Sequence, residues 1–171
     1  MRIEHNGRIP QIAQNVYMSH NTVIIGDVVI GEDSSIWFGS VVRGDENYIR
    51  IGRGSNIQDL CMLHVTHERY PLFIGDDVTI GHRALVHGCR IKSRCLIGMG
   101  AVLLDGTIVG EESIVAAGSV VKEGMIVPPQ TLVAGVPAQI KRDLNQEDIE
   151  YIVNSAKRYV EYARHYMGLK V

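Results

Sequence analysis

An aliphatic side chain recurs at every sixth position through most of this chain of 171 residues. The run begins at Met18, Ile24 and Ile30 and ends at Val127 and Val133. A period of six matches neither an amphipathic helix, with a period of about 3.6, nor a single half-buried strand, with a period of about 2. It is typical of a hexapeptide solenoid, in which three short strands and three tight turns make one triangular coil of about 18 residues. The sequence therefore predicts an all-β solenoid, a parallel β-helix of about six or seven coils.

The repeated aliphatic side chains are expected to point into the solenoid. Each then stacks on its equivalent in the next coil about 4.8 Å away, which is the distance between neighbouring strands. Glycines follow several of these aliphatic residues. We expect them at the corners of the coils, in conformations with positive φ that are low in energy only without a Cβ atom. The set comprises Gly26, Gly31, Gly75, Gly98 and Gly110.

Three irregularities interrupt the repeat. Consecutive aliphatic positions are nine residues apart over 42–51, eleven apart over 63–74 and five apart over 86–91. A solenoid accommodates extra residues as loops that leave the regular coil. Because the irregular region is also rich in histidine, we interpret it as a functional site rather than as scaffold. Its histidines are His64, His67, His82 and His87.

A different pattern follows near the C-terminus. Asn145 can cap a helix whose first turn is acidic, and Gly168 is a stop signal. Apolar residues recur between them at helical spacing, which predicts one amphipathic helix over 145–167. We therefore divide the chain into a β-helix domain, residues 1–143, and a C-terminal α-helix, residues 144–171, that packs along an outer face of the same domain.

Charge and cysteine content exclude several classes of partner. The 17 basic and 19 acidic residues give a net charge of -2, so the chain has no basic field for nucleic acid and no polybasic patch for a membrane. No apolar run is long enough to cross a bilayer, and the polar N-terminus does not resemble a secretory signal. Three cysteines without CxxC spacing argue against a disulfide framework. We expect a cytoplasmic protein with buried free thiols and no nucleic-acid or membrane partner.

The histidine positions within a coil suggest a shared ion. His64 and His87 each follow an inward aliphatic residue by one position, whereas His82 follows by two. Suppose that the inserted loop within 63–74 counts as one six-residue unit of the repeat. His64 and His82 then lie on the same face of adjacent coils, and His87 lies one corner further on. One chain then brings two rings within reach of one ion. Because zinc requires about 2.0–2.1 Å to each imidazole nitrogen, a partner chain is the simplest source of the third ring.

Four segments of the chain resemble one protein family. They are VVRGDENYIRIG, SNIQDLCMLHV, IGHRALVHGC and the closing AGVPAQIKR. Together they resemble the γ-class carbonic anhydrases and their relatives, and the resemblance covers nearly the whole chain. It implies a left-handed β-helix that assembles as a homotrimer, with Zn²⁺ or another divalent metal such as Fe²⁺ or Co²⁺ at each subunit interface. The implied reaction is the reversible hydration of carbon dioxide to bicarbonate.

The resemblance also implies the metal ligands, which are His64 and His87 of one subunit and His82 of its neighbour. Three neutral imidazoles leave the fourth position of zinc open to water, and the cation lowers the pKa of that water to about 7. The resulting hydroxide attacks carbon dioxide. Gln58 matches a family residue that orients this nucleophile, and Asn56 is expected to assist it.

Other residues match positions around the family's site. Arg43 resembles a residue that pairs across the interface with Asp45 or Asp59. Glu46 resembles a residue near the pocket. Tyr159, on the final helix, matches a position from which a hydroxyl reaches the site.

The chain departs from the founding members of the family in one loop. Those members carry an acidic loop whose glutamate exports protons from the metal water. Here the short segment after His64 carries His67 and Glu68 instead. His67, with an ordinary pKa of about 6.5, suits a proton shuttle, and a plain solvent-exposed position is the alternative.

Two other functional classes remain open. Hexapeptide solenoids also host acetyl transfer from coenzyme A, which uses one catalytic histidine at a trimer interface, needs no metal and shares the GVPA exit. The other class is a thioesterase, or a metal-binding relative with weak or no anhydrase activity. Fold alone does not separate these classes. A count of bound metal separates the acetyltransferase from the others.

Overall fold

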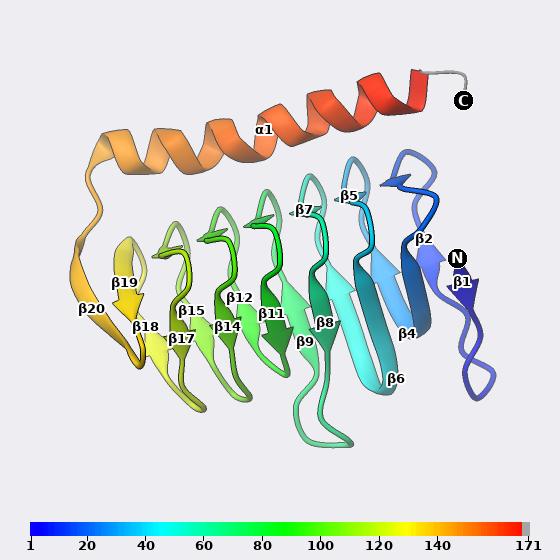
Figure 1. Ribbon diagram of the computed structural model, residues 1–171, viewed down its shortest axis with the longest axis horizontal. Helices are drawn as coiled ribbons and strands as arrows, with labels where there is room; N and C mark the ends of the chain where they lie inside the picture. Colours follow the sequence, from blue (N-terminus) through cyan, green and yellow to red (C-terminus); the bar gives the residue numbers. More distant parts are fainter. Residues whose placement is uncertain (169–171) are drawn as a thin grey trace.

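The computed structural model describes residues 1–168 of the chain. Residues 169–171, which end the predicted helical unit, lie outside the described residues. The chain winds into a left-handed parallel β-helix with one long α-helix beside it (Figure 1). Short strands of successive coils pair with one another and build three faces. The predicted fold class is therefore confirmed.

The three faces are defined by the strands that pair along them. The first face contains β1 (Arg2–Ile3), β8 (Met62–His64), β11 (Leu85–His87), β14 (Val102–Leu103) and β17 (Val120–Val121). The second face contains β2 (Gln11–Ile12), β9 (Leu72–Ile74), β12 (Arg90–Ile91), β15 (Ile108–Val109) and β18 (Ile126–Val127). The long strands β4 (Val23–Ile30) and β6 (Val41–Ile51) turn the corner between these two faces and pair on both.

The third face gives the number of coils. It contains β3 (Tyr17–Met18), β5 (Ser35–Ile36), β7 (Asn56–Ile57), β10 (Thr79–Ile80), β13 (Leu96–Ile97), β16 (Ile114–Val115), β19 (Thr131–Gly135) and β20 (Ala138–Asp143). Of these eight strands, β20 pairs antiparallel with β19 and closes the end of the β-helix. Seven parallel strands remain, one for each coil.

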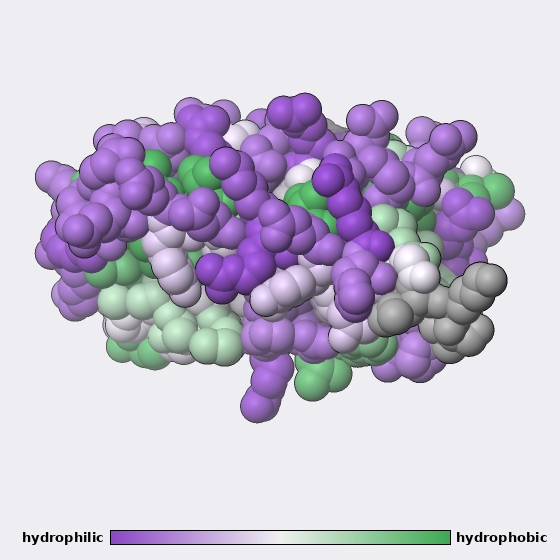
Figure 2. Space-filling view, turned by 90° about the horizontal axis from the view of Figure 1, so that it is seen from above, coloured by the Kyte–Doolittle hydropathy of each residue, from purple (hydrophilic) through white to green (hydrophobic). Residues whose placement is uncertain are grey.

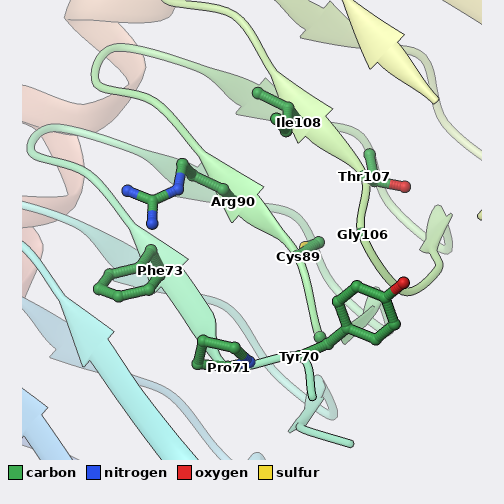
Figure 3. A pocket seen from close by; sticks show the side chains of 9 residues that line it. Tyr70, Pro71, Phe73, Cys89, Arg90, Gly106, Thr107 and Ile108 are labelled. Atoms are coloured by element: carbon green, nitrogen blue, oxygen red, sulfur yellow. The ribbon is translucent and has the colours of Figure 1, made fainter. Parts of the chain in front are cut away.

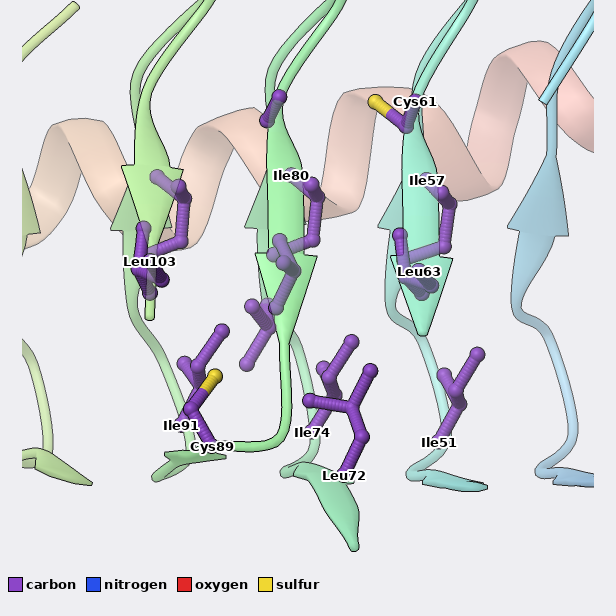
Figure 4. Packing of buried hydrophobic residues seen from close by; sticks show 14 of the residues in the cluster. Ile51, Ile57, Cys61, Leu63, Leu72, Ile74, Ile80, Cys89, Ile91 and Leu103 are labelled. Carbon is purple, nitrogen blue, oxygen red and sulfur yellow. The ribbon is translucent and has the colours of Figure 1, made fainter. Parts of the chain in front are cut away.

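The interior is a stack of aliphatic side chains, as the repeat predicts. Ile57 pairs with Ile80, and Ile80 pairs with Ile97, on neighbouring strands of the third face, and all three are fully buried. Leu103 reaches the same interior from the first face (Figure 4). Every repeated aliphatic residue after Met18 is buried. Since burying one such side chain stabilises by about 1.5–3 kcal/mol, the stack is the main source of stability.

The corner glycines are needed mostly for close packing rather than for positive φ. Of the predicted set, only Gly26 has a positive φ, at 75°. A Cβ atom on Gly110 would lie 2.4 Å from the backbone nitrogen of Pro129 in the next coil. Positive φ occurs instead at other turn positions such as Gly118, at 67°. The predicted positive φ is therefore wrong for Gly31, Gly75, Gly98 and Gly110.

The three breaks in the repeat fall at one corner, between the first and second faces. The strand β6 absorbs the first insertion, and its pairing with β4 shifts between Gly26 and Val28. Residues 65–71 form the second, a loop that projects below the β-helix (Figure 1) and closes through a bridge between Thr66 and Tyr70. The shortened unit is the turn from β11 to β12. One corner thus carries all three breaks in the repeat.

The C-terminal helix α1 (Gln146–Gly168) lies along the third face, over β3, β5, β7 and β10. Its buried residues are Ile152, Ala156 and Ala163. Its outer surface is mainly hydrophilic, as Figure 2 shows from the helix side. No helix within residues 1–168 combines the length and apolar character that a membrane crossing requires. The predicted amphipathic helix and its packing on one outer face are confirmed.

The first turn of α1 is capped reciprocally. The Oδ1 atom of Asn145 accepts a hydrogen bond from the backbone N–H of Asp148 at 2.9 Å. The Oδ2 atom of Asp148 accepts one from the backbone N–H of Asn145, also at 2.9 Å. Both contacts satisfy amide groups that have no partner inside the helix.

We expect Asn145→Ala to lower the free energy of unfolding by about 1 kcal/mol, because it leaves the Asp148 amide without its acceptor. Urea unfolding followed by circular dichroism measures this change. Asn154→Ala, at an exposed position inside the helix, is the matched control and should not lower the midpoint, because alanine is the better helix former. Equal shifts for both variants would show that the cap has no special role.

Candidate metal centre

His64 and His87 lie side by side where β8 and β11 end. They are directly paired in the register of these strands, and because Leu63 and Val86 point inward, both rings point outward. The Nδ1 atom of His64 lies 3.0 Å from the Nε2 atom of His87. The expected pairing of His64 with His82 on one face is therefore wrong. The loop after β8 occupies no unit of the repeat, because Leu63 and Ile74 lie on consecutive faces of the same coil, and β11 therefore aligns His87 with His64.

His82 lies at the other edge of the first face, in the turn between β10 and β11. Its Nδ1 atom is 2.7 Å from Oδ2 of Asp59, which occupies the turn before β8. Its side chain is 41% exposed and borders an open pocket at the surface. The strand β11 separates His82 from His87. We call His64 and His87 the histidine pair. One chain thus carries the histidine pair at one edge of the first face and His82 at the other edge.

Carboxylates occupy the outer nitrogens of the histidine pair. The Oδ1 atom of Asp45 lies 3.2 Å from Nε2 of His64, and Oδ1 of Asp105 lies 2.6 Å from Nδ1 of His87. An ionised carboxylate only accepts hydrogen bonds, so each neutral ring directs its N–H outward. The two inner nitrogens then present lone pairs to each other. A cation between them removes this repulsion, which is the donor chemistry of a metal site.

The local charges favour these protonation states. Burial lowers the pKa of His64, and the guanidinium of Arg43 lowers it further, although the hydrogen bond to Asp45 opposes the shift. Burial alone would raise the pKa values of Asp45 and Asp105. Hydrogen bonds, chiefly from Arg43 to Asp45 and from Thr66 to Asp105, outweigh burial and lower both values. At neutral pH, His64 is therefore neutral, whereas Asp45 and Asp105 are ionised.

Arg43 pairs with Asp45 within the same chain, with Nη1 of the arginine 2.6 Å from Oδ2 of the carboxylate. The carboxylate thereby bridges Arg43 and His64. Asp59, the other predicted partner of Arg43, instead contacts His82. Pairing of Arg43 across a subunit interface stays a prediction.

Asn56 and Gln58 form a polar chain that ends at His82. The Nδ2 group of Asn56 donates to Oγ1 of Thr79 at 3.0 Å, and Nε2 of Gln58 donates to Oδ1 of Asn56 at 3.2 Å. The Oε1 atom of Gln58 accepts the backbone N–H of His82 at 3.1 Å. Asn56 and Gln58 are both buried, so these contacts fix their orientation. The structure thus brings Gln58 into contact with the backbone of His82 and places Asn56 behind Gln58.

The remaining predicted residues lie farther out. Glu46 is exposed on β6, and His67 projects from the loop 65–71 with its side chain 70% exposed. Tyr159 lies on α1 and packs edge-on against Trp37, with ring centroids 5.4 Å apart. Burial, together with the negative charge of Asp59, raises the pKa of the Tyr159 hydroxyl. Glu46 and His67 thus belong to the edge of the histidine pair, and Tyr159 to the side of the third face.

A shallow pocket on the second face is separate from these residues (Figure 3). It encloses about 190 Å³ beside Tyr70, and Arg90 stacks over Phe73 with its guanidinium carbon 4.1 Å from the ring centroid. None of the residues predicted for the site lines it. The pocket therefore has no evident part in the chemistry of the histidines.

A single chain provides only part of a metal site. Among residues 1–168, no group of three or more histidine, cysteine, aspartate or glutamate side chains surrounds a common point. The histidine pair supplies two imidazole donors of the kind that zinc accepts. The cysteines do not add to it, since all three are buried and burial raises the pKa of Cys61 to about 12. The donor set fits a metal that is shared with a second chain.

Two residues of this centre escaped the sequence analysis. They are Asp105, which contacts His87, and Thr66, whose hydroxyl contacts the other oxygen of Asp105. A signal for the first was present, because Asp105 follows His87 by 18 residues, one full coil. Thr66 lies in an inserted loop, where the repeat gives no register.

Comparison with known proteins agrees with this fold. Residues 10–44 and 88–123 match the family of bacterial transferase hexapeptide (six repeats). The crystal structure of a hexapeptide transferase family protein from Anaplasma phagocytophilum has a TM-score of 0.93 and 37% identity, covering 97% of this chain and 98% of that chain. The shared architecture thus extends over almost the entire length of both proteins.

Two named relatives identify the family. The carbonic anhydrase of Geobacillus kaustophilus is 46% identical over 166 residues, which cover 97% of this chain and 91% of the relative. The mitochondrial gamma carbonic anhydrase 2 of Arabidopsis thaliana is 44% identical over 160 residues, 91% of this chain, and the match spans 58% of that longer relative. The chain belongs to the gamma carbonic anhydrase family.

Proposed function

We propose that the protein is a metal-dependent carbonic anhydrase that interconverts carbon dioxide and bicarbonate. The observation that carries this proposal is the histidine pair, whose inner nitrogens lie 3.0 Å apart while both outer nitrogens face carboxylates. Membership of the gamma carbonic anhydrase family supports the reaction. Zn²⁺ is the proposed metal, with Fe²⁺ and Co²⁺ as alternatives, since imidazole suits all three.

We further propose a homotrimer in which each metal is shared between two subunits. The histidine pair and His82 lie at opposite edges of the first face. A head-to-tail contact brings the pair of one chain to His82 of the next, and such contacts close into a ring. Large hydrophobic side chains are exposed on or beside this face, which is typical of an interface. They are Leu60, Leu85, Met99 and Leu104.

The proposed mechanism assigns roles to residues of this chain. A bound divalent metal supplies a hydroxide nucleophile at neutral pH because it lowers the pKa of water to about 7. Gln58, fixed by Asn56, orients the attacking group from the His82 side. Arg43 holds Asp45 against His64.

Three exposed or peripheral residues have proposed roles as well. His67, on its loop, accepts the proton released during hydration and passes it to solvent. Glu46 lies on the same side and borders the entrance. Tyr159 directs its hydroxyl toward the site from α1. A cytoplasmic location fits the three free, buried cysteines, which belong to no disulfide.

The acetyltransferase alternative explains fewer observations. Acetyl transfer from coenzyme A needs one histidine and no metal, so it does not explain why the two inner nitrogens of the histidine pair face each other. A thioesterase, or a relative that binds metal without fast hydration, uses the same metal ligands. Only assays of the reactions themselves separate this last class from an anhydrase.

Stopped-flow hydration of carbon dioxide by metal-loaded protein tests the proposal. We expect about one ion per chain and a hydration rate at least about 100-fold above that of metal-free protein. His64→Gln is the matched control and should lack both the metal and the rate. Thioester hydrolysis and acetyl transfer are measured on the same samples. Full metal loading without faster hydration of carbon dioxide would contradict the proposed anhydrase activity. Acetyl transfer by metal-free protein would favour the acetyltransferase.

A further inference from the structure

Asp105 holds His87 from the neighbouring coil. Its Oδ1 atom accepts a hydrogen bond from Nδ1 of His87 at 2.6 Å, and its Oδ2 atom accepts one from Oγ1 of Thr66 at 2.5 Å. Thr66 comes from the loop 65–71, His87 from the end of β11 and Asp105 from the turn after β14. Both carboxylate oxygens are therefore held, and neither contact involves the inner nitrogen of His87.

The approach of Asp105 to His87 depends on a residue without a side chain. Gly88 follows His87 directly, and a Cβ atom there would lie 2.4 Å from Oδ1 of Asp105 and 2.8 Å from Cβ of Tyr70. Tyr70 and Thr66 form the bridge that closes the loop 65–71. The loop, the glycine and the carboxylate thus pack as one unit around the outer nitrogen of His87.

We propose that Asp105, anchored by Thr66, is a positioning residue that fixes the tautomer and the ring orientation of His87. Because the ionised carboxylate only accepts, its contact places the proton on Nδ1 and leaves the Nε2 lone pair directed at His64. Outer partners of this kind orient metal-binding histidines and strengthen them as donors. The inference rests on the proposed metal site and adds two residues that do not bind the metal.

This arrangement gives the inserted loop a second role. Thr66 lies within the loop and is partly buried, whereas His67 next to it is exposed. The loop therefore supports the metal site through Thr66 whether or not His67 carries protons. Thr66 and His67 act on different steps, so their substitutions are expected to have separable effects.

The tautomer of His87 can be measured in metal-free protein. In long-range ¹⁵N–¹H spectra of ¹⁵N-histidine-labelled protein, assigned with His87→Gln, we expect wild-type His87 to be protonated at Nδ1. Asp105→Ala should give a mixture of tautomers or the Nε2–H form. Asp105→Asn should shift the ring in the same direction, because its amide N–H can donate to Nδ1 while its oxygen accepts the Thr66 hydroxyl. Glu111→Ala, at an exposed carboxylate that pairs with Arg94, is the control.

Metal affinity provides the second measurement. Titration of metal-free protein with Co²⁺, followed by its visible absorption, should show a Kd about 10–100-fold higher for Asp105→Ala than for wild type. Thr66→Val should raise the Kd less, and Thr66→Ser should return it toward the wild-type value because the hydroxyl is retained.

The outcomes separate this inference from the proposed function. If wild type binds Co²⁺ but Asp105→Ala binds equally well and keeps the Nδ1–H tautomer, the positioning role is refuted and the metal site stands. If wild type binds no metal, the proposed function fails, and the tautomer in metal-free protein still decides the role of Asp105. Circular dichroism of each variant shows whether the β-helix is intact. If Asp105→Ala unfolds, Thr66→Val takes its place in both measurements.

Discussion

Co-refolded mixtures of His82→Ala and His87→Ala chains are expected to regain metal sites that neither variant forms alone. Each variant by itself lacks one ligand at every interface. In a mixed ring, the His82→Ala chain supplies an intact histidine pair, and a neighbouring His87→Ala chain supplies His82. Random assembly of equal amounts restores about one quarter of the sites. Metal content after gel filtration measures the recovery.

The matched control uses two variants whose lost ligands lie on the same side of the interface. Mixtures of His64→Ala and His87→Ala chains contain no chain with a complete histidine pair. They should therefore recover nothing. Recovery in this control, or none in the first mixture, would argue that the metal ligands are not divided between chains as proposed. Light scattering on the wild type, with an expected mass of three times 18.9 kDa, checks the trimer itself.

Each single variant should keep the β-helix. His82 lies in a turn and the histidine pair lies at strand ends, so none of these side chains belongs to the buried stack. Solenoid stability is close to a sum over coils and their neighbours, which leaves the fold insensitive to loss of the metal. Far-ultraviolet circular dichroism that matches wild type is the expected result.

The fold was predictable because one short-range signal repeats along the chain. A side chain such as Ile80 contacts its equivalents in the coils before and after, so periodicity alone specifies its neighbours. The helix was predictable for a similar reason, since the Asn145 cap and the apolar stripe are local. The role of Gly110 was not predictable from the sequence, because its close contact with Pro129 depends on how the coils stack.

The site was less predictable than the fold because inserted residues change the register. The identity of the histidines followed from a family resemblance, but the spacing between His64 and His82 misplaced them when the loop 65–71 was counted as one slot. Asp105 and Thr66 meet across 39 residues of sequence. Contacts made by a loop that leaves the coil have no period, so they depend on the three-dimensional path of the loop.

Gly110→Ala is expected to destabilise the protein by about 3 kcal/mol, a large effect for the addition of a single methyl group. The added Cβ atom would meet backbone atoms of Pro128 and Pro129 at 2.4–2.8 Å. Backbone cannot rotate aside as a flexible side chain does, so adjacent coils must separate. The residue lies between β15 and β16, away from the histidines, and the loss should therefore appear in metal-free protein. Urea unfolding measures it.

Gly118→Ala distinguishes close packing from backbone conformation. Gly118 has a φ of 67°, and no atom lies within 4 Å of the position that a Cβ atom would take. Alanine there therefore meets conformational strain of about 1–2 kcal/mol but no clash. A larger loss for Gly110→Ala than for Gly118→Ala shows that the corners select glycine through the spacing of the coils. The reverse order would mean that positive φ is the stronger constraint, and that the coils can part locally to admit a methyl group.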